Sequence, residues 1–208
     1  MPVVPGRKKG ELEQPFDYEQ AHAELVQAMQ TLHISRVDEM PRIELYLDQV
    51  LSIVTTELAP LYEPGEKIIT GSMVNNYVKQ RVMPAPTRKR YTRRHLASLL
   101  FVCSLKRVLS IAQVAQVLTL CREAQIDLPR AYDSMCSALE HMLGTCFTED
   151  IPHVTTPELE LYDISGQPVT GQLAALLHSS LGLIVNSVYV EKLLALEARR
   201  PHAEALER

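Results

Sequence analysis

Apolar side chains recur at intervals of three and four residues along most of the chain, which is the spacing of amphipathic helices. The pattern predicts helices over 16–34, 41–61, 71–81, 93–108, 111–121, 128–144 and 170–200. Residues with good capping side chains precede several of these segments, and we expect helix starts just after Thr70, Thr92, Ser110, Asp127 and Thr170. We expect the second helix to begin at Pro41. The fold class that follows is all-α.

Two segments interrupt the helical pattern. Residues 82–91 contain Pro84 and Pro86, each of which disfavours helix at the residue before it. Three consecutive basic residues follow, and the segment predicts an extended ribbon, or small β wing. Residues 147–169 predict an irregular connection with short strands, and residues 1–15 predict a flexible tail.

The overall composition is that of an ordinary globular protein, with 46% apolar and 22% charged residues and a net charge of −4. Gly, Pro and Cys are too few for collagen-like or disulfide-rich classes. We expect the four cysteines to be reduced core residues. Residues 1–15 contain no apolar stretch, and polar residues interrupt the most apolar window, 173–190. These features predict a cytoplasmic protein with no export signal and no membrane partner.

Charge is strongly segregated along the chain. Residues 67–122 contain eleven of the 21 Lys and Arg residues and none of the 25 Asp and Glu residues. Segregation on this scale favours a module that faces a polyanion, within an otherwise acidic protein. The alternative is a basic face that acidic groups balance elsewhere in the same fold or in a partner chain.

Eleven residues of this basic segment are candidates for contact with double-stranded DNA. In the helix 71–81, Asn side chains can read adenine and Lys or Arg can reach guanine or phosphate. The helix start near Thr70 can hold a phosphate on its free amides. Asn75 and Asn76 are adjacent, so we expect at most one to contact a base; the alternative is a surface or capping role. The candidates are Ser72, Asn75, Asn76, Lys79, Arg81, Arg88, Lys89, Arg90, Tyr91, Arg93 and Arg94.

The basic ribbon provides the strongest of these candidates. Arg88, Lys89 and Arg90 would lie along phosphates or enter a minor groove, and the alternative is a solvated loop. Arg93 and Arg94 begin a helix, where positive charge opposes the helix dipole, so an external anion would compensate them. Tyr91 could contact a phosphate, although packing of the ribbon is the favoured interpretation.

Patterns typical of enzymes and metal sites are weak. The chain has no Gly-rich phosphate loop, nucleophile elbow or paired-carboxylate motif, so we expect no catalytic residues and no cofactor. Cys136, His141, Cys146 and His153 lie within 18 residues, but Cys136 and His141 are five apart and do not share a helix face. We therefore expect no metal site.

The order of these elements resembles the winged-helix DNA-binding proteins of the MerR type. The resemblance rests on 70–118, with Pro84 and Pro86, then "RYT" at 90–92, then "LSI" at 109–111. The chain lacks the usual "GVS" turn of that family. Over 35–140 it also resembles the bacterial family called domain of unknown function 1836, through "MPRIELYLDQV", "MVNNYVKQRVMPAP", "KRYTRRHL" and "LKRVLSI". That resemblance implies a MerR-like fold and DNA binding.

These observations together predict a sequence-specific DNA-binding transcriptional regulator with no chemistry of its own. We expect a flexible tail over 1–15, a winged-helix DNA-binding domain over 16–122 and a helical region for dimerisation or effector binding over 123–208. A homodimer is implied by the MerR resemblance and by the broad apolar face of the last helix. The sequence does not indicate an effector. The competing hypothesis is a non-enzymatic adaptor whose basic face docks an acidic protein.

Overall fold

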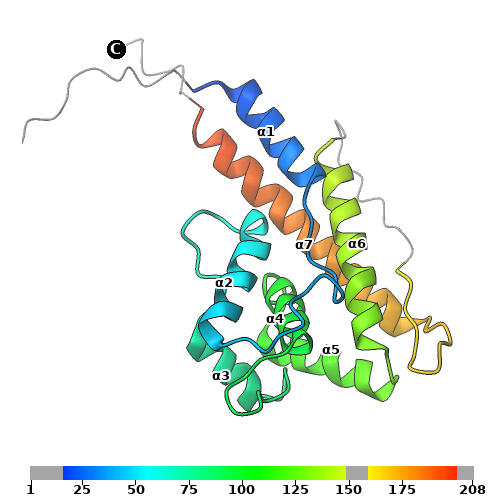
Figure 1. The fold of residues 1–208 in the computed structure, drawn as a ribbon. Coiled ribbons are helices and arrows are strands. Elements are labelled where there is room, and N and C mark those ends of the chain that lie inside the picture. Colours follow the sequence, from blue (N-terminus) through cyan, green and yellow to red (C-terminus); the bar gives the residue numbers. More distant parts are fainter. Residues whose placement is uncertain (1–15, 149–158, 201–208) are drawn as a thin grey trace, which may run out of the picture.

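The computed structural model describes residues 16–148 and 159–200 (Figure 1). The expected tail over 1–15 and His153 lie outside the described residues. Within these ranges the fold is all-α, as predicted. Its helices are α1 (Tyr18–Gln30), α2 (Leu47–Leu58), the short 3-10 helix η1 (Ala59–Leu61), α3 (Gly71–Lys79), α4 (Arg93–Lys106), α5 (Ile111–Glu123), α6 (Leu128–Cys146) and α7 (Gln172–Glu197).

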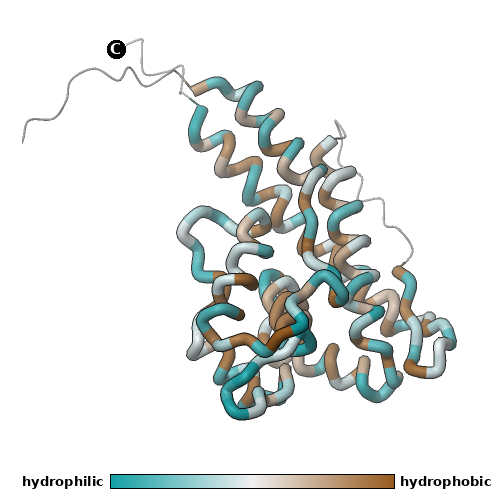
Figure 2. The backbone as a smooth tube through the Cα atoms, viewed as in Figure 1, coloured by the Kyte–Doolittle hydropathy of each residue, from teal (hydrophilic) through white to brown (hydrophobic). Residues whose placement is uncertain are grey.

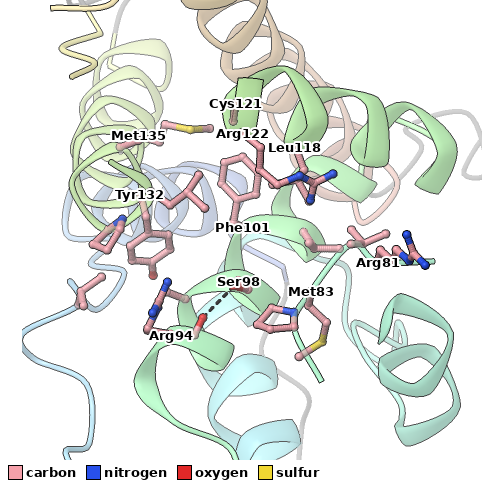
Figure 3. A pocket seen from close by; sticks show the side chains of 18 of the residues that line it. Arg81, Met83, Arg94, Ser98, Phe101, Leu118, Cys121, Arg122, Tyr132 and Met135 are labelled. Atoms are coloured by element: carbon pink, nitrogen blue, oxygen red, sulfur yellow. Dashed lines mark hydrogen bonds between the residues drawn. The ribbon is translucent and has the colours of Figure 1, made fainter. Parts of the chain in front are cut away.

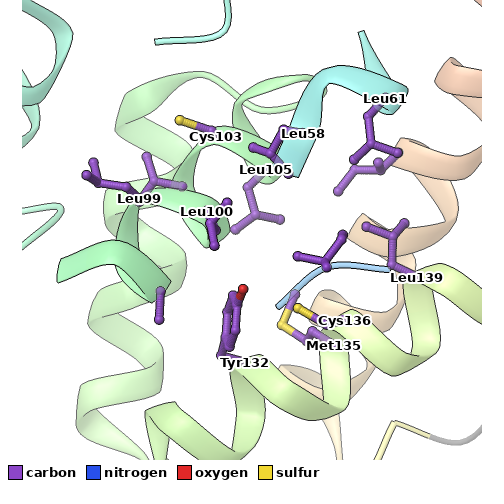
Figure 4. Close-up of a cluster of buried hydrophobic side chains, with 14 of the residues drawn as sticks. Leu58, Leu61, Leu99, Leu100, Cys103, Leu105, Tyr132, Met135, Cys136 and Leu139 are labelled. Carbon is purple, nitrogen blue, oxygen red and sulfur yellow. The ribbon is translucent and has the colours of Figure 1, made fainter. Parts of the chain in front are cut away.

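Two groups of helices share one continuous hydrophobic core. α1, α6 and α7 pack on one another at one end of the molecule; at the other end α2 and α5 pack on α4, and α3 packs on α2 (Figure 1). α4 also touches α6 and α7, so it joins the two groups. In Figure 4 the buried side chains of α2, α4 and α6 meet, among them Leu58, Leu100 and Leu139.

The central position of α4 explains why most of its side chains are buried. Eight of its residues are buried, from His95 to Leu105, which leaves only a narrow exposed strip. By contrast, hydrophobic and hydrophilic residues alternate along α1 and α7 in Figure 2, as expected of helices with one face in the core. Burying a Leu side chain contributes roughly 1.5–3 kcal/mol, so α4 is central to the stability of both groups.

The grouping of helices differs from the division expected from sequence. We placed α1 with the basic segment, but α1 packs against α6 and α7. The chain between α1 and α2 then crosses α6, where Glu140 accepts hydrogen bonds from the Ile34 amide (2.7 Å) and from both terminal nitrogens of Arg36. An amphipathic pattern shows that a helix has a buried face, but it does not show which helix covers that face.

Four predicted helix starts are confirmed by their hydrogen bonds. Thr70 accepts from the Met73 amide (3.2 Å), and Asp127 accepts from the Arg130 amide (3.3 Å). Ser110 forms a reciprocal capping box with Gln113, and Thr92 forms one with His95 at the start of α4. The helix predicted to end at Gly144 continues to Cys146.

Two other predicted starts are wrong. α2 begins at Leu47 instead of Pro41, because Leu45 is extended and exchanges two backbone hydrogen bonds with Tyr91 (2.8 and 2.9 Å). α7 has Gly171 at its N-cap instead of Thr170. Gly171 has a φ of +83°, which glycine adopts readily and threonine does not.

No residue of the described ranges lies in a β-strand, so the expected β wing is present only as isolated bridges. Leu45 pairs with Tyr91, and Thr87 pairs with Arg90. Ile126 pairs with Asp163 and Tyr162 with Pro168, in the connection where short strands were expected. The segment joining α2 to α3, 59–70, is also longer than the three- or four-residue turn of a helix-turn-helix.

Of the helices described, α7 alone is long and apolar enough to cross a membrane by length and composition. Core helices of globular proteins reach the same length and composition. Leu177, Leu181 and Ile184 of α7 are buried in the protein's own core.

Candidate nucleic-acid interface

α3 turns one face to the core and the opposite face to solvent. Val74 and Tyr77 are buried, whereas the other face carries the exposed residues Ser72, Asn75, Asn76 and Lys79. Their spacing of three and four residues places them on one stripe of the helix. Asn75 and Asn76 are therefore both exposed, one on each side of the stripe. The side chain of Asn76 accepts a hydrogen bond from Gln80 (3.1 Å), while the side chain of Asn75 bonds no other described residue.

Arg81 ends α3 in a left-handed backbone conformation. Its φ is +58°, and the hydrogen bonds from Arg81 N to Val78 O (3.1 Å) and from Val82 N to Tyr77 O (2.9 Å) form a Schellman motif. Glycine is the usual residue at this position. The motif turns the chain sharply, so that Val82 and Met83 are buried and Arg81 stays exposed.

A tight turn in the loop between α3 and α4 carries two exposed cations, Arg88 and Lys89. Arg90 N donates to Thr87 O (2.9 Å), and the two residues between them, Arg88 and Lys89, have φ values of +51° and +62°. Two consecutive positive φ angles are typical of a type I′ turn, which normally contains Asn and Gly. Both side chains are exposed.

The base of this turn is held by aromatic contacts. Tyr91 is buried, and its ring meets the imidazole of His95 edge-on at 5.7 Å. The Arg90 guanidinium lies over the ring of Tyr46, 3.7 Å from its centroid. The ring of Tyr91 therefore packs the base of the turn. The guanidinium of Arg90 already has a cation–π contact with Tyr46, whereas the side chains of Arg88 and Lys89 at the tip of the turn are exposed.

His95 joins the loop to the start of α4. Its Nδ1 accepts from the Thr92 amide (3.0 Å), which leaves Nε2 to donate to the carbonyl of Ala85 (3.3 Å). His95 thus occupies the place that Glu or Gln takes in a capping box, three residues after the N-cap. It fixes the loop relative to Arg93 and Arg94, which occupy the first turn of α4.

A comparison with protein-family models finds a match over residues 35–135 to the family described as domain of unknown function (DUF1836). This segment, just under half of the chain, is similar to the DUF1836 family. The matched segment extends from the residues before α2 into the first half of α6, and it contains all eleven candidate residues. Neither the curated proteins nor the solved structures gave a match.

The basic residues of the matched segment 35–135 fall into two kinds. Arg36 and Arg107 bind the carboxylates of Glu140 and Glu191. The others form no ion pair with any described residue: the seven cationic candidates Lys79, Arg81, Arg88, Lys89, Arg90, Arg93 and Arg94, and also Arg42, Lys67, Lys106, Arg122 and Arg130. The seven candidates belong to α3, the following loop or the first turn of α4, at the end of the molecule opposite the C-terminal end of α7 (Figure 1).

Sequence reasoning missed several residues that shape this interface. Arg107 is one of these, because its side chain is 3% exposed and lies over the ring of Tyr62. The capping role of His95 could have been predicted from the sequence, because His95 lies three residues after the N-cap residue Thr92. The pairing of Leu45 with Tyr91 had none, because the two are 46 residues apart. In the described part of the chain, no group of His, Cys, Asp or Glu side chains is arranged to hold a metal.

Proposed function

We propose that the matched segment 35–135 binds double-stranded DNA, and that the chain acts as a transcriptional regulator with a MerR-like winged-helix arrangement. One observation carries this proposal. The cations of α3, the following loop and α4 form no ion pair with a described residue, although the protein carries an excess of acidic residues. Unpaired cations repel one another, and a polyanion would remove that repulsion. This geometry disfavours a basic face balanced within its own fold.

The candidate residues divide into two roles. Arg88 and Lys89 at the tip of the turn would neutralise phosphates, with Arg93 and Arg94 adding further phosphate contacts. The exposed stripe of α3 would face base edges. On that stripe Asn75 is the best candidate for reading adenine, because its amide group is free of other described residues. Tyr91 would position the turn through packing and would not touch DNA.

We further propose that α7 pairs with α7 of a second copy. Its exposed apolar residues Leu176, Leu183 and Val190 recur every seven positions, and Leu194 continues the row. The exposed residues between them, Ser179 and Asn186, are uncharged. A heptad row with a single Asn suits a self-complementary helix pair and specifies its register. Two copies would present two basic faces to one duplex.

The first test is fluorescence-anisotropy binding to the DNA upstream of the protein's own coding sequence, beside scrambled DNA, from 50 to 300 mM salt. We expect tighter binding to the cognate fragment and a log–log salt slope of about −4 to −6, since each neutralised phosphate contributes ~0.9. The variant R88Q/K89Q removes only exposed side chains and should reduce the slope by about 2. R199Q, just past the C-terminal end of α7, is the matched control.

The competing adaptor function predicts a different result. The face would then bind an acidic protein, and DNA binding would be absent even at 50 mM salt. DNA affinity that R88Q/K89Q leaves unchanged would refute the proposed role of the turn.

A further inference from the structure

A cavity of about 550 Å³ lies directly behind the candidate DNA interface (Figure 3). Its walls come from α4, α5 and α6 and from residues 81–85 of the loop after α3. A volume of this size is within the range of small-molecule sites. Nothing in the proposed DNA contacts requires a space here.

The floor of the cavity is apolar and its polar atoms are already bonded. Val102, Cys121 and Met135 are buried there, and burial raises the pKa of the Cys121 thiol to about 11, so the thiol stays neutral. The hydroxyl of Tyr132 donates to the carbonyl of Ser35 (2.8 Å), and that of Ser98 donates to the carbonyl of Arg94 (2.8 Å). The floor therefore suits the apolar part of a ligand.

The rim of the same cavity is basic. Arg81, Arg94 and Arg122 line it from three different elements, all three are exposed, and none forms an ion pair with a described residue. Among the described residues that line the cavity there is no Asp or Glu. An apolar floor below three guanidinium groups selects a ligand with an apolar body and one anionic end.

We propose that this cavity binds a small amphipathic organic anion, with its apolar body on the floor and its carboxylate or equivalent group at Arg94 and Arg122. Arg81 and Arg94 are also candidate DNA contacts, and the loop that lines the cavity leads to the basic turn. A bound anion would thus compete with phosphate for these arginines. This competition rests on the proposed DNA binding, whereas ligand binding itself does not.

Isothermal titration calorimetry with saturated carboxylates from butanoate to decanoate, each below its micelle concentration, tests the site on the full chain. Affinity should rise about fourfold per methylene until the floor is covered. Decylamine, with the same body and opposite charge, should bind at least tenfold more weakly than decanoate. Equal binding of the two, or no dependence on chain length, would overturn the proposal.

Neighbouring arginines provide matched variants. R94Q should weaken decanoate binding at least fivefold, whereas R93Q should not, because Arg93 precedes it in the same helical turn but does not line the cavity. A97L, which narrows the cavity from α4, should weaken decanoate and decan-1-ol alike, with circular dichroism as the check on folding. Equal losses in R93Q and R94Q would indicate a non-specific charge effect and refute the site.

The competition is measured separately, by DNA anisotropy at constant ionic strength with and without saturating decanoate. We expect the DNA affinity to fall in the unmodified protein and to stay constant in A97L. Decanoate binding without any effect on DNA affinity would refute the competition alone. If no DNA binds under any condition, the proposed function fails, and the calorimetry still decides whether the cavity holds an anion.

Discussion

The basic turn stores conformational strain that a double substitution should release. Arg88 and Lys89 both occupy the left-handed region, with φ values of +51° and +62°. This region costs an L-residue ~1–2 kcal/mol, and the Asn-Gly pair that type I′ turns favour avoids most of that cost. Gly also makes the unfolded chain more flexible, and this entropy cancels roughly 0.5–1 kcal/mol of the stability gained by relieving the strain. The variant R88N/K89G should therefore be more stable by about 1–2 kcal/mol.

Thermal unfolding followed by circular dichroism measures the gain, which corresponds to about 2–6 °C in Tm for a protein of this size. The same variant loses two exposed cations, so DNA binding should weaken at least about tenfold and the salt slope should fall by about 2. R88Q/K89Q is the matched control. It removes the same charges but keeps the left-handed strain, so its DNA affinity should fall equally while its Tm stays within about 1 °C of the unmodified protein.

A Tm that falls in R88N/K89G, or that rises equally in R88Q/K89Q, would refute the strain argument. The second result would mean that charge repulsion, and not backbone conformation, limits stability at the turn. A stable variant with unchanged DNA affinity would show that the turn does not contact DNA. DNA binding would then not explain why Arg88 and Lys89 keep their left-handed backbone conformation.

Three other perturbations test the fold and the proposed assembly. Y77F removes a buried hydroxyl that has no hydrogen-bond partner among the described residues, so urea unfolding should show unchanged stability or a gain of up to about 1 kcal/mol. A stability loss of more than about 1 kcal/mol would show that the hydroxyl does have a partner. E140A removes the carboxylate that pairs with the Arg36 guanidinium and accepts from the Ile34 amide in a partly buried site, and leaves the guanidinium only its neutral acceptors, the Ile34 carbonyl and the Ser137 hydroxyl. The substitution should lower the free energy of unfolding by about 2–4 kcal/mol in the same assay, with E140Q intermediate. L183K places a charge in the middle of the exposed row of α7, and sedimentation should show a folded monomer; an unchanged mass would exclude pairing through this face.

Much of the local structure followed from the sequence because it depends on neighbouring residues. Helix periodicity and capping side chains act over three or four positions, so the starts at Thr70, Thr92, Ser110 and Asp127 were predicted correctly. The segregation of charge was also visible directly. It led to the cations of α3, the loop and α4 that form no ion pair with any residue described in the structure.

Contacts between distant residues were decided by the tertiary structure alone. The pairing of Leu45 with Tyr91 delays the start of α2, and Glu191 of α7 binds Arg107 in the interior. The left-handed conformations of Arg88 and Lys89 oppose their local preference, and the surrounding contacts of Tyr46, Tyr91 and His95 hold the loop in place. Such choices depend on which surfaces meet, and the local pattern contains no information about that.

The cavity also combines features visible in the sequence with features that only the tertiary structure decides. Each of its arginines was visible in the sequence as part of a basic segment, but Arg81, Arg94 and Arg122 belong to three separate elements. Only the packing of α4, α5 and α6 places them around one apolar space. The sequence by itself determined the helices, their caps and the sign of the charge on each segment, because these depend on short-range interactions and composition. The tertiary structure decided which cations are paired, which are free and which surround a cavity, because those properties depend on the packing of residues far apart in the chain.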